Sequence, residues 1–161
     1  NEMGLLDKAR VYATDINTDV IDQAKQGEYK YRFNLAYLDN FDKVIKENPY
    51  NYEEYIDVPY EKYFALDKAN DTIKMNSFLR DKPVFKKHDL VTENNTLYVK
   101  FDLILCRNVI IYFSRETQET VLSHMCSHLE SGGYLFMGHS ETLSGFALPL
   151  KQVATTVYRK K

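Results

Sequence analysis

The chain has 161 residues, of which 44% are hydrophobic and 27% are charged, and its formal net charge is -2. This length suits a single domain with a sizeable core, and the slightly negative charge argues against a general nucleic-acid-binding protein, which usually carries a basic face. No apolar stretch approaches the roughly 20 residues of a membrane span, and no signal-peptide pattern opens the chain, so we expect a cytoplasmic protein without membrane insertion.

The first predicted unit is a strand followed by a helix. Residues Ala9–Asp15 have the pattern of a strand, Asn17 is a suitable N-cap for the next helix, and Gly27 is a natural helix end. Asp15 therefore lies at the tip of a strand that precedes a helix. In nucleotide-binding α/β folds an acidic side chain at this place accepts hydrogen bonds from ribose hydroxyls. A helix-capping or solvated carboxylate is the alternative.

Residues 29–82 have a different character and predict a small inserted α+β subdomain between residues 1–28 and 83–161 of the main domain. Many of the 13 tyrosines of the chain fall here, and Pro49 and Pro59 interrupt it. The expected elements are a short helix around Phe41, Val44 and Ile45, another over Tyr55–Leu66, a turn at Ala69–Asp71, a strand over Thr72–Met75 and a turn at Leu79–Pro83.

Two further strands are predicted at Pro83–Leu90 and within Phe101–Phe113. The second begins with an apolar run typical of a buried strand in a parallel sheet, and Arg107 and Asn108 follow where that strand should end. Ligands of such sheets bind just beyond the carboxyl ends of the strands. The Arg-Asn pair is therefore a candidate binding feature.

The last third of the chain predicts a helix and two strands. Ser114 is a good N-cap for a helix over Arg115–Glu130 that ends at Gly132–Gly133. Strands are expected at Tyr134–Gly138 and Val153–Tyr158, and Phe146–Leu150 could pair with the second of them. The predicted apolar face of the helix consists of Val121, Leu122, Met125, Cys126 and Leu129.

Alternation of strands and helices in this order, with glycines at helix ends, predicts an α/β fold with three layers. Cys106 falls in a predicted strand and Cys126 in a predicted helix, without CxxC spacing, which indicates two buried free thiols.

The sequence also contains parts of known catalytic motifs, but no catalytic or nucleotide-binding motif is complete. His124 and His128 have the spacing of a zinc-binding helix, but the general-base Glu is missing, so no metal site is predicted. Ser140 is not a nucleophile in a G-x-S-x-G elbow, because Thr142 replaces the second Gly; a loop lining a site fits this segment better. Neither a G-x-G-x-x-G nor a Walker A sequence is present.

Taken together, three segments resemble the CheR family of chemotaxis receptor methyltransferases. They are Ala13–Asn17 (ATDIN), Cys106–Phe113 (CRNVIIYF) and Gly133–Glu141 (GYLFMGHSE), and their order and spacing also fit. The resemblance implies a Rossmann-like methyltransferase fold that uses S-adenosylmethionine, with S-adenosylhomocysteine as product, to methylate glutamate side chains on the cytoplasmic domain of chemoreceptors.

The resemblance also implies roles for particular residues. Asp15 would hold the ribose hydroxyls, while Asp89 and Leu90 would flank the adenine; the family usually has Asn where this chain has Asp89. Arg107 and Asn108 would border the methionine part of the cofactor. Arg107 and Tyr112 are the expected catalytic residues, with Tyr112 facing the reacting methyl group and Arg107 pairing with the substrate carboxylate.

The resemblance further implies that the inserted subdomain docks on receptors. Some members use a glycine-containing loop there to grip a tethering peptide, and the matching turn, Leu66–Thr72, has no glycine, which favours a peptide-independent member.

The family's helical N-terminal domain, first strand and glycine-containing loop have no counterpart here. We therefore expect an incomplete fold that is inactive alone and has the missing N-terminal part of the same enzyme as a partner. A non-catalytic interaction module, or a related methyltransferase with another substrate, remains an alternative.

Overall fold

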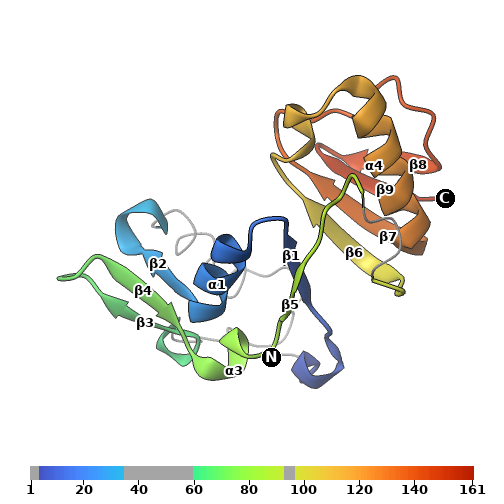
Figure 1. The fold of residues 1–161 in the computed structure, drawn as a ribbon. Helices are drawn as coiled ribbons and strands as arrows, with labels where there is room; N and C mark the ends of the chain where they lie inside the picture. Colours follow the sequence, from blue (N-terminus) through green and yellow to red (C-terminus); the bar gives the residue numbers. More distant parts are fainter. Residues whose placement is uncertain (1–3, 35–59, 93–96) are drawn as a thin grey trace. The chain divides into compact units, whose positions relative to one another are not determined.

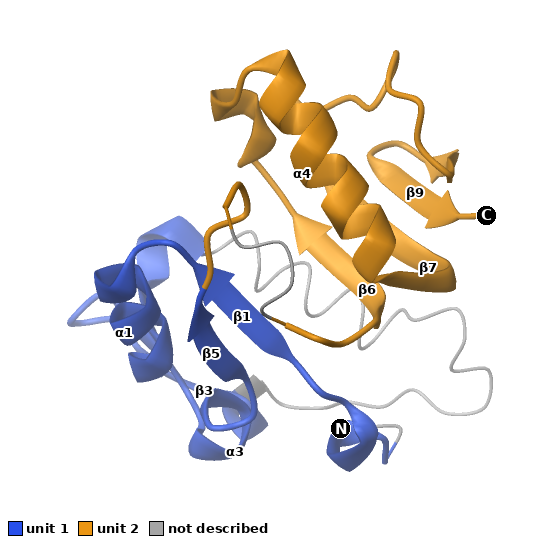
Figure 2. Cartoon of the chain, turned by 45° about the vertical axis from the view of Figure 1, so that its right-hand side comes forward, with its two compact units in different colours: residues 1–87 blue, residues 88–161 orange. Residues whose placement is uncertain are grey.

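A computed structural model of the chain describes residues 4–34, 60–92 and 97–161. The chain divides into two compact units, Asn1–Lys87 and His88–Lys161 (Figure 2). Each unit has its own sheets, and each is described by itself below.

The first unit contains the predicted strand–helix pair. Strand β1 (Tyr12–Asp15) pairs in parallel with β5 (Val84–Lys87), and helix α1 (Thr18–Gln26) follows β1. The side chain of Asn17 accepts a hydrogen bond from the backbone N–H two residues further on at 2.8 Å, and Gly27 ends the helix with a φ of 61°. Both predicted caps are therefore confirmed, and both strands are shorter than predicted.

A second, antiparallel sheet lies in the same unit. Its strand order is β2–β4–β3, from strands β2 (Glu28–Lys30), β4 (Thr72–Met75) and β3 (Phe64–Asp67) (Figure 1). This sheet has a small core of its own, because Phe64 and Ile73 are buried side by side with Tyr63. Two short helical segments, η2 (Tyr60–Lys62) and α3 (Ser77–Arg80), flank these strands in the sequence.

The predictions for this region are partly confirmed. The turn at Ala69–Asp71 connects β3 to β4, and the strand Thr72–Met75 is β4. The sequence predicts a helix over Tyr55–Leu66, but the described part of this range forms η2 and the first residues of β3, so the prediction is wrong there. Helix α3 includes the first two residues of the turn expected at Leu79–Pro83. The helix expected around Phe41, Val44 and Ile45 lies outside the described residues.

The second unit is built on a four-stranded sheet of order β6–β7–β9–β8. Strand β6 (Phe101–Cys106) is parallel to β7 (Leu129–Met137), while β9 (Val157–Lys160) is antiparallel to both β7 and β8 (Leu150–Ala154). The parallel β6–β7 pair confirms the type of sheet predicted for this stretch.

Helix α4 (Arg115–His128) connects β6 to β7 and packs on one face of the sheet (Figures 1 and 2). Its N-cap is Ser114, whose Oγ accepts a hydrogen bond from the backbone N–H of Thr117 at 3.3 Å, as predicted. The predicted apolar face is also confirmed, since its members are all buried: Val121, Leu122, Met125, Cys126 and Leu129.

Two boundary predictions in this unit are wrong. The helix ends at His128 rather than at Gly132–Gly133, because Leu129 already has an extended backbone and begins β7. The strand predicted over Val153–Tyr158 contains a hairpin turn, in which Thr156 has a φ of 59°, so the segment belongs to the two strands β8 and β9.

Strand β6 is buried on one face only, which corrects the prediction of a fully buried strand. Cys106 is 5% exposed, whereas Leu103 and Leu105 on the opposite face are 48% and 65% exposed. Among the described strands β6 pairs with β7 alone, and β1 pairs with β5 alone. Within the described part of the chain, no helix is long and apolar enough to cross a membrane.

Candidate functional site

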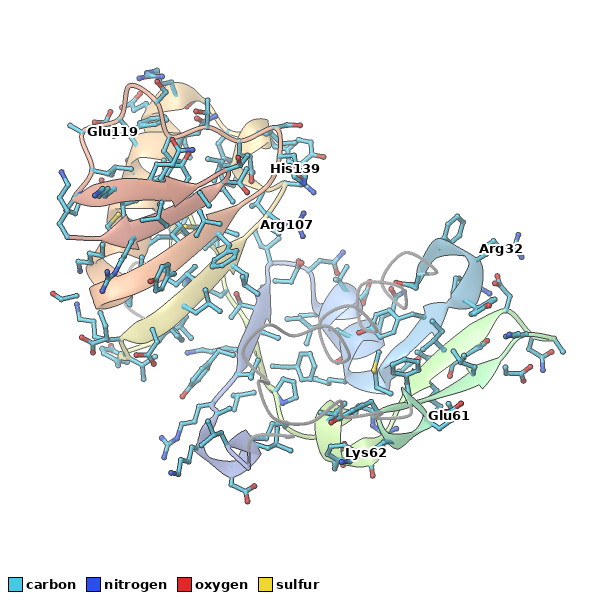
Figure 3. The ribbon with its side chains drawn as sticks, turned by 180° about the vertical axis from the view of Figure 1, so that it is seen from behind. Arg32, Glu61, Lys62, Arg107, Glu119 and His139 are labelled. Carbon is cyan, nitrogen blue, oxygen red and sulfur yellow. The ribbon has the colours of Figure 1, made fainter. Side chains whose placement is uncertain are left out.

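The candidate site lies where the chain leaves β6. Arg107 and Asn108 follow the strand directly, and the next residues form a short 3-10 helix, η3 (Ile110–Tyr112), rather than a continuation of the sheet. Because β7 is the parallel neighbour of β6, the residues after β7 emerge at the same edge. Figure 3 shows Arg107 and His139 near this edge of the second unit.

The carboxylate of Glu141 binds both loops at this edge. Its Oε2 accepts hydrogen bonds from the backbone N–H groups of Gly138 (2.7 Å) and Asn108 (2.9 Å), and its Oε1 accepts from those of Val109 (2.8 Å) and Ile110 (2.9 Å). Successive backbone N–H groups that converge in this way form an anion-binding nest. Here the anion is a side chain of the protein itself.

Glu141 is 4% exposed, and it is the only buried charged residue in the described part of the chain. Burial, the largest single influence, raises the pKa of this carboxyl, but the hydrogen bonds from the four backbone N–H groups together outweigh it and hold the pKa below its ordinary value. Glu141 is therefore charged at neutral pH, with its charge balanced by backbone dipoles.

Gln118 of α4 holds the other end of η3. Its Nε2 donates hydrogen bonds to the backbone oxygens of Ile110 and Phe113, both at 3.0 Å. The segment 108–113, which contains η3, is thus bound through three N–H groups by Glu141 and through two carbonyl groups by Gln118. This bonding leaves the backbone of the turn little freedom to move.

The side chains that this turn presents are open to solvent. Tyr112 is 80% exposed, and Arg107 and Asn108 are also exposed. The side chains of Arg107 and Tyr112 have no hydrogen bond or ion pair with another described residue. Their polar groups are therefore available to a ligand. The turn fixes the backbone and leaves these side chains free to bind.

Asp89 and Leu90 lie at the start of the second unit, directly after His88. The carboxylate of Asp89 accepts from the backbone N–H of Val91 at 2.8 Å and from the hydroxyl of Thr92 at 2.8 Å. The Val91 bond, together with the Thr92 hydroxyl, lowers the pKa of Asp89. Leu90 packs against the core of this unit, which includes Cys106 and Ile110.

Asp15 belongs to the first unit, at the carboxyl end of β1 and in register with Lys87 of β5. Its Oδ1 accepts a hydrogen bond from the backbone N–H of Asn17 at 2.8 Å, in the turn that precedes helix α1. Oδ2 has no partner among the described residues. The carboxylate can therefore assist the turn and still accept a hydrogen bond from a ligand.

Sequence reasoning missed Glu141 and Gln118 as members of the site. The sequence suggested Ser140 as a possible nucleophile, whereas the next residue, Glu141, makes the hydrogen bonds to the turn. An isolated Glu shortly after a predicted strand is an ordinary loop residue in sequence terms. The available signals were its position as the last residue of Gly133–Glu141, a segment that resembles the CheR family, and its place in a loop that leaves a parallel strand.

In the histidine pair on α4, only the ring of His128 contacts the helix backbone. His128 Nδ1 lies 2.9 Å from the backbone oxygen of His124. No group of three or more His, Cys, Asp or Glu side chains in residues 4–34, 60–92 and 97–161 has an arrangement that could hold a metal ion.

The fold and the site together define a class of protein. An α/β unit with polar side chains just beyond the carboxyl ends of parallel strands has the architecture of α/β proteins that bind a ligand at that edge. The family described as "CheR methyltransferase, SAM binding domain" matches residues 39–159. The chain belongs to the CheR methyltransferase family and has the corresponding α/β methyltransferase fold.

Curated relatives agree with this assignment. A chemotaxis protein methyltransferase of Borreliella burgdorferi is 31% identical over 95% of this chain and 47% of its own length. The chemotaxis protein methyltransferase of Vibrio anguillarum is 33% identical over 88% of this chain and 45% of its own length. That of Salmonella typhimurium is 28% identical over 92% of this chain and 46% of its own length. The chain thus spans about half the length of the relatives it matches.

Polar groups in each of the two units, taken separately, are chemically suited to parts of the cofactor of this family. S-adenosylmethionine carries ribose hydroxyls, a purine and a methionine carboxylate beside a sulfonium. Asp15 offers an acceptor for hydroxyls, and the exposed guanidinium of Arg107 offers a donor for a carboxylate.

Proposed function

We propose that the protein to which this chain belongs transfers a methyl group from S-adenosylmethionine to glutamate side chains of a chemoreceptor cytoplasmic domain. The observation that supports this most is family membership combined with the turn after β6, where Glu141 and Gln118 hold the backbone that presents Arg107, Asn108 and Tyr112. A cytoplasmic location follows from that substrate.

This chemistry needs little acid–base catalysis from the protein. A glutamate side chain is ionised near pH 7, so it is already a nucleophile. S-adenosylmethionine, when bound, supplies a methyl group on a positively charged sulfur. The contribution of this chain is then to orient the two reactants and to exclude water.

The proposed division of labour follows the motifs that this chain shares with the CheR family. Asp15 accepts from the ribose, Asp89 and Leu90 border the adenine, and Arg107 and Asn108 border the methionine part. For Asp89, the bonds to Val91 and Thr92 restrict the carboxylate, but each oxygen has a second lone pair that can accept from an amino group.

Arg107 and Tyr112 are the proposed catalytic residues, because their exposed polar groups stand on the constrained turn. The guanidinium of Arg107 can pair with the incoming substrate carboxylate, and the Tyr112 hydroxyl can orient it. Too tight a pair with Arg107 would lower the nucleophilicity of the carboxylate.

The receptor is proposed to contact the sheet formed by β2, β4 and β3. The turn between β3 and β4 carries the exposed Lys68, whose positive charge suits an acidic substrate. Lys68→Glu should raise the KM for receptor and leave the affinity for S-adenosylmethionine unchanged. Lys151→Glu, the same change on exposed β8, is the matched control, and equal effects of the two variants would refute the assignment of this surface.

We also propose that the missing N-terminal part of the same enzyme covers the exposed face of β6. Leu103 and Leu105 are large apolar side chains that stand open on this strand, and such residues normally gather where another segment packs. Leu105→Gln should destabilise the full-length protein by about 1–3 kcal/mol. In this 161-residue chain alone the same change should cost under about 0.5 kcal/mol.

The control for this experiment is Val153→Gln, a similarly exposed apolar residue on β8. Equal effects of Leu105→Gln in the long and short proteins would contradict the proposal. Calorimetry gives a second test, because this chain alone should bind S-adenosylmethionine weakly. Tight binding would show that its site is already complete.

The proposed activity is tested with the full-length protein, purified receptor cytoplasmic domain and S-adenosylmethionine with a labelled methyl group. Base-labile label on receptor glutamates is the expected result. Label on another protein would indicate a related methyltransferase with a different substrate. Receptor binding without any transfer would indicate a non-catalytic interaction module.

A further inference from the structure

Glu141 is an unusual group to find inside a protein core. It is a buried carboxylate with no ion-pair partner among the described residues, and its solvation is replaced by backbone N–H groups alone. Burying a charge is costly unless such bonds are all made. The carboxylate at this position therefore restricts the positions of the backbone N–H groups that surround it.

The constraint falls on the turn that carries the proposed catalytic side chains. Three successive N–H donors, those of Asn108, Val109 and Ile110, converge on Glu141, while the fourth, that of Gly138, ties the turn to the end of β7. Asn108 has a φ of 59°, a left-handed conformation that is uncommon for non-glycine residues and that Asn tolerates better than most.

Gln118 acts on the same turn from the helix side. Its two hydrogen bonds, to the carbonyls of Ile110 and Phe113, bracket Tyr112 in the sequence. Neither Glu141 nor Gln118 is exposed, so neither is placed to meet a receptor directly. Any effect of Glu141 and Gln118 on the reaction must therefore act through the backbone of the turn that both bind.

We propose that Glu141 and Gln118 are positioning residues for methyl transfer, which together hold the backbone of residues 108–113 so that Tyr112 and Asn108 meet the reactants in one geometry. This inference rests on the proposed function. It adds two residues that do not touch the cofactor or the substrate and yet set the turnover rate.

The test is a double-mutant cycle in the full-length protein, with kcat and KM measured for S-adenosylmethionine and for receptor domain. Glu141→Gln keeps the size of the side chain and removes its charge. We expect kcat to fall roughly 10- to 100-fold, as for a small misplacement of reacting groups, with a much smaller change in the KM for S-adenosylmethionine.

Coupling to Tyr112 distinguishes positioning from general support of the fold. If Glu141 acts through this turn, Tyr112→Phe should cost much less in the Glu141→Gln background than in the wild-type protein. Glu119→Gln, the same chemical change at an exposed position of α4, is the matched control and should leave kcat unchanged (Figure 3). Strictly additive losses from Glu141→Gln and Tyr112→Phe would overturn the inference.

A second variant covers the case in which Glu141→Gln fails to fold. Gln118→Met preserves side-chain length and removes both amide hydrogen bonds, and it should show the same coupling to Tyr112→Phe. Wild-type protein without any methyl transfer would refute the proposed function itself. Wild-type protein that transfers methyl groups, with additive losses in the cycle, would refute only the positioning role.

Discussion

The side chain of Asn108 occupies the space beside Gly138 that a methyl group would need. A Cβ built on Gly138 would lie 2.3 Å from Asn108 Oδ1 and 2.8 Å from the backbone nitrogen of Asn108. It would also lie 2.8 Å from Oε2 of Glu141. The turn after β6 and the end of β7 are therefore in contact through a position where only hydrogen fits.

Gly138→Ala should accordingly destabilise the protein by about 1–3 kcal/mol, because both the Asn108 backbone and the Glu141 carboxylate would have to shift. Urea denaturation measures this free energy. Gly4→Ala is the control, because a Cβ there meets no heavy atom within 4 Å and the cost is limited to a left-handed backbone. A Gly138→Ala protein as stable as the wild type would mean that the contact is not maintained in solution.

Stability should depend on pH through Glu141. The pKa of this carboxyl is lower in the folded protein than its ordinary value of 4.5, so its contribution is fully present above the pKa of the unfolded chain. The contribution is lost as pH falls through the folded pKa. The wild type should therefore lose stability below about pH 4.5 more steeply than Glu141→Gln, by at most about 1.4 kcal/mol per pH unit.

The comparison with Glu141→Gln is needed because the pKa values of Asp67, Asp71 and Asp89 are also lowered in the folded protein. Those carboxyl groups titrate in both proteins, and their effect cancels in the difference. Parallel curves for the two proteins between pH 5 and pH 3 would contradict a charged, hydrogen-bonded Glu141.

Tyr112→Phe should lower turnover more than cofactor affinity. The hydroxyl is proposed to orient the incoming carboxylate, and a single orienting group typically contributes a loss of about 10-fold or more when removed. Methyl-transfer kinetics and calorimetry with S-adenosylmethionine separate the two quantities. Tyr98→Phe, at another exposed tyrosine outside the turn, is the control and should change neither.

The opposite outcome would be informative. Weaker cofactor binding with intact turnover would remove Tyr112 from the reacting end of the site. The tyrosine would then have to be reassigned to a role in holding the cofactor.

The thiol of Cys106 should be unreactive in the folded protein. Burial, and then the negative charge of Glu141, raise its pKa to about 12, so only about one molecule in 10,000 carries the reactive thiolate at pH 8. Burial also raises the pKa of Cys126, although Lys160 partly opposes this effect. Mass spectrometry after iodoacetamide treatment should find neither cysteine alkylated until the chain is unfolded in urea.

Rapid alkylation of Cys106 in the native protein would contradict its burial at the end of β6. Glu141→Gln should increase the labelling rate of Cys106, because the turn that covers it loses its bonds. The rate for Cys126, which is buried on α4, should change less.

The local features of the fold could be predicted from the sequence because each depends on neighbours in the chain. Asn17 and Ser114 cap helices through bonds to residues two and three positions away, and the buried face of α4 follows from its helical period. The stretch from β6 to Tyr112 was identified as a candidate site for the same kind of reason, namely polar residues at the end of an apolar strand.

Tertiary structure decided what lies beyond that range. The carboxylate of Glu141 meets residues 31 to 33 positions away, and no local pattern distinguishes it from an ordinary loop glutamate. The exposure of Leu105 likewise depends on what packs against its face of β6, since an apolar run has the same sequence whether one face or both are covered. The sequence by itself determined which residues lie at the strand ends. The hydrogen bonds that fix their backbone join residues far apart in the chain, so these bonds exist only in the folded protein.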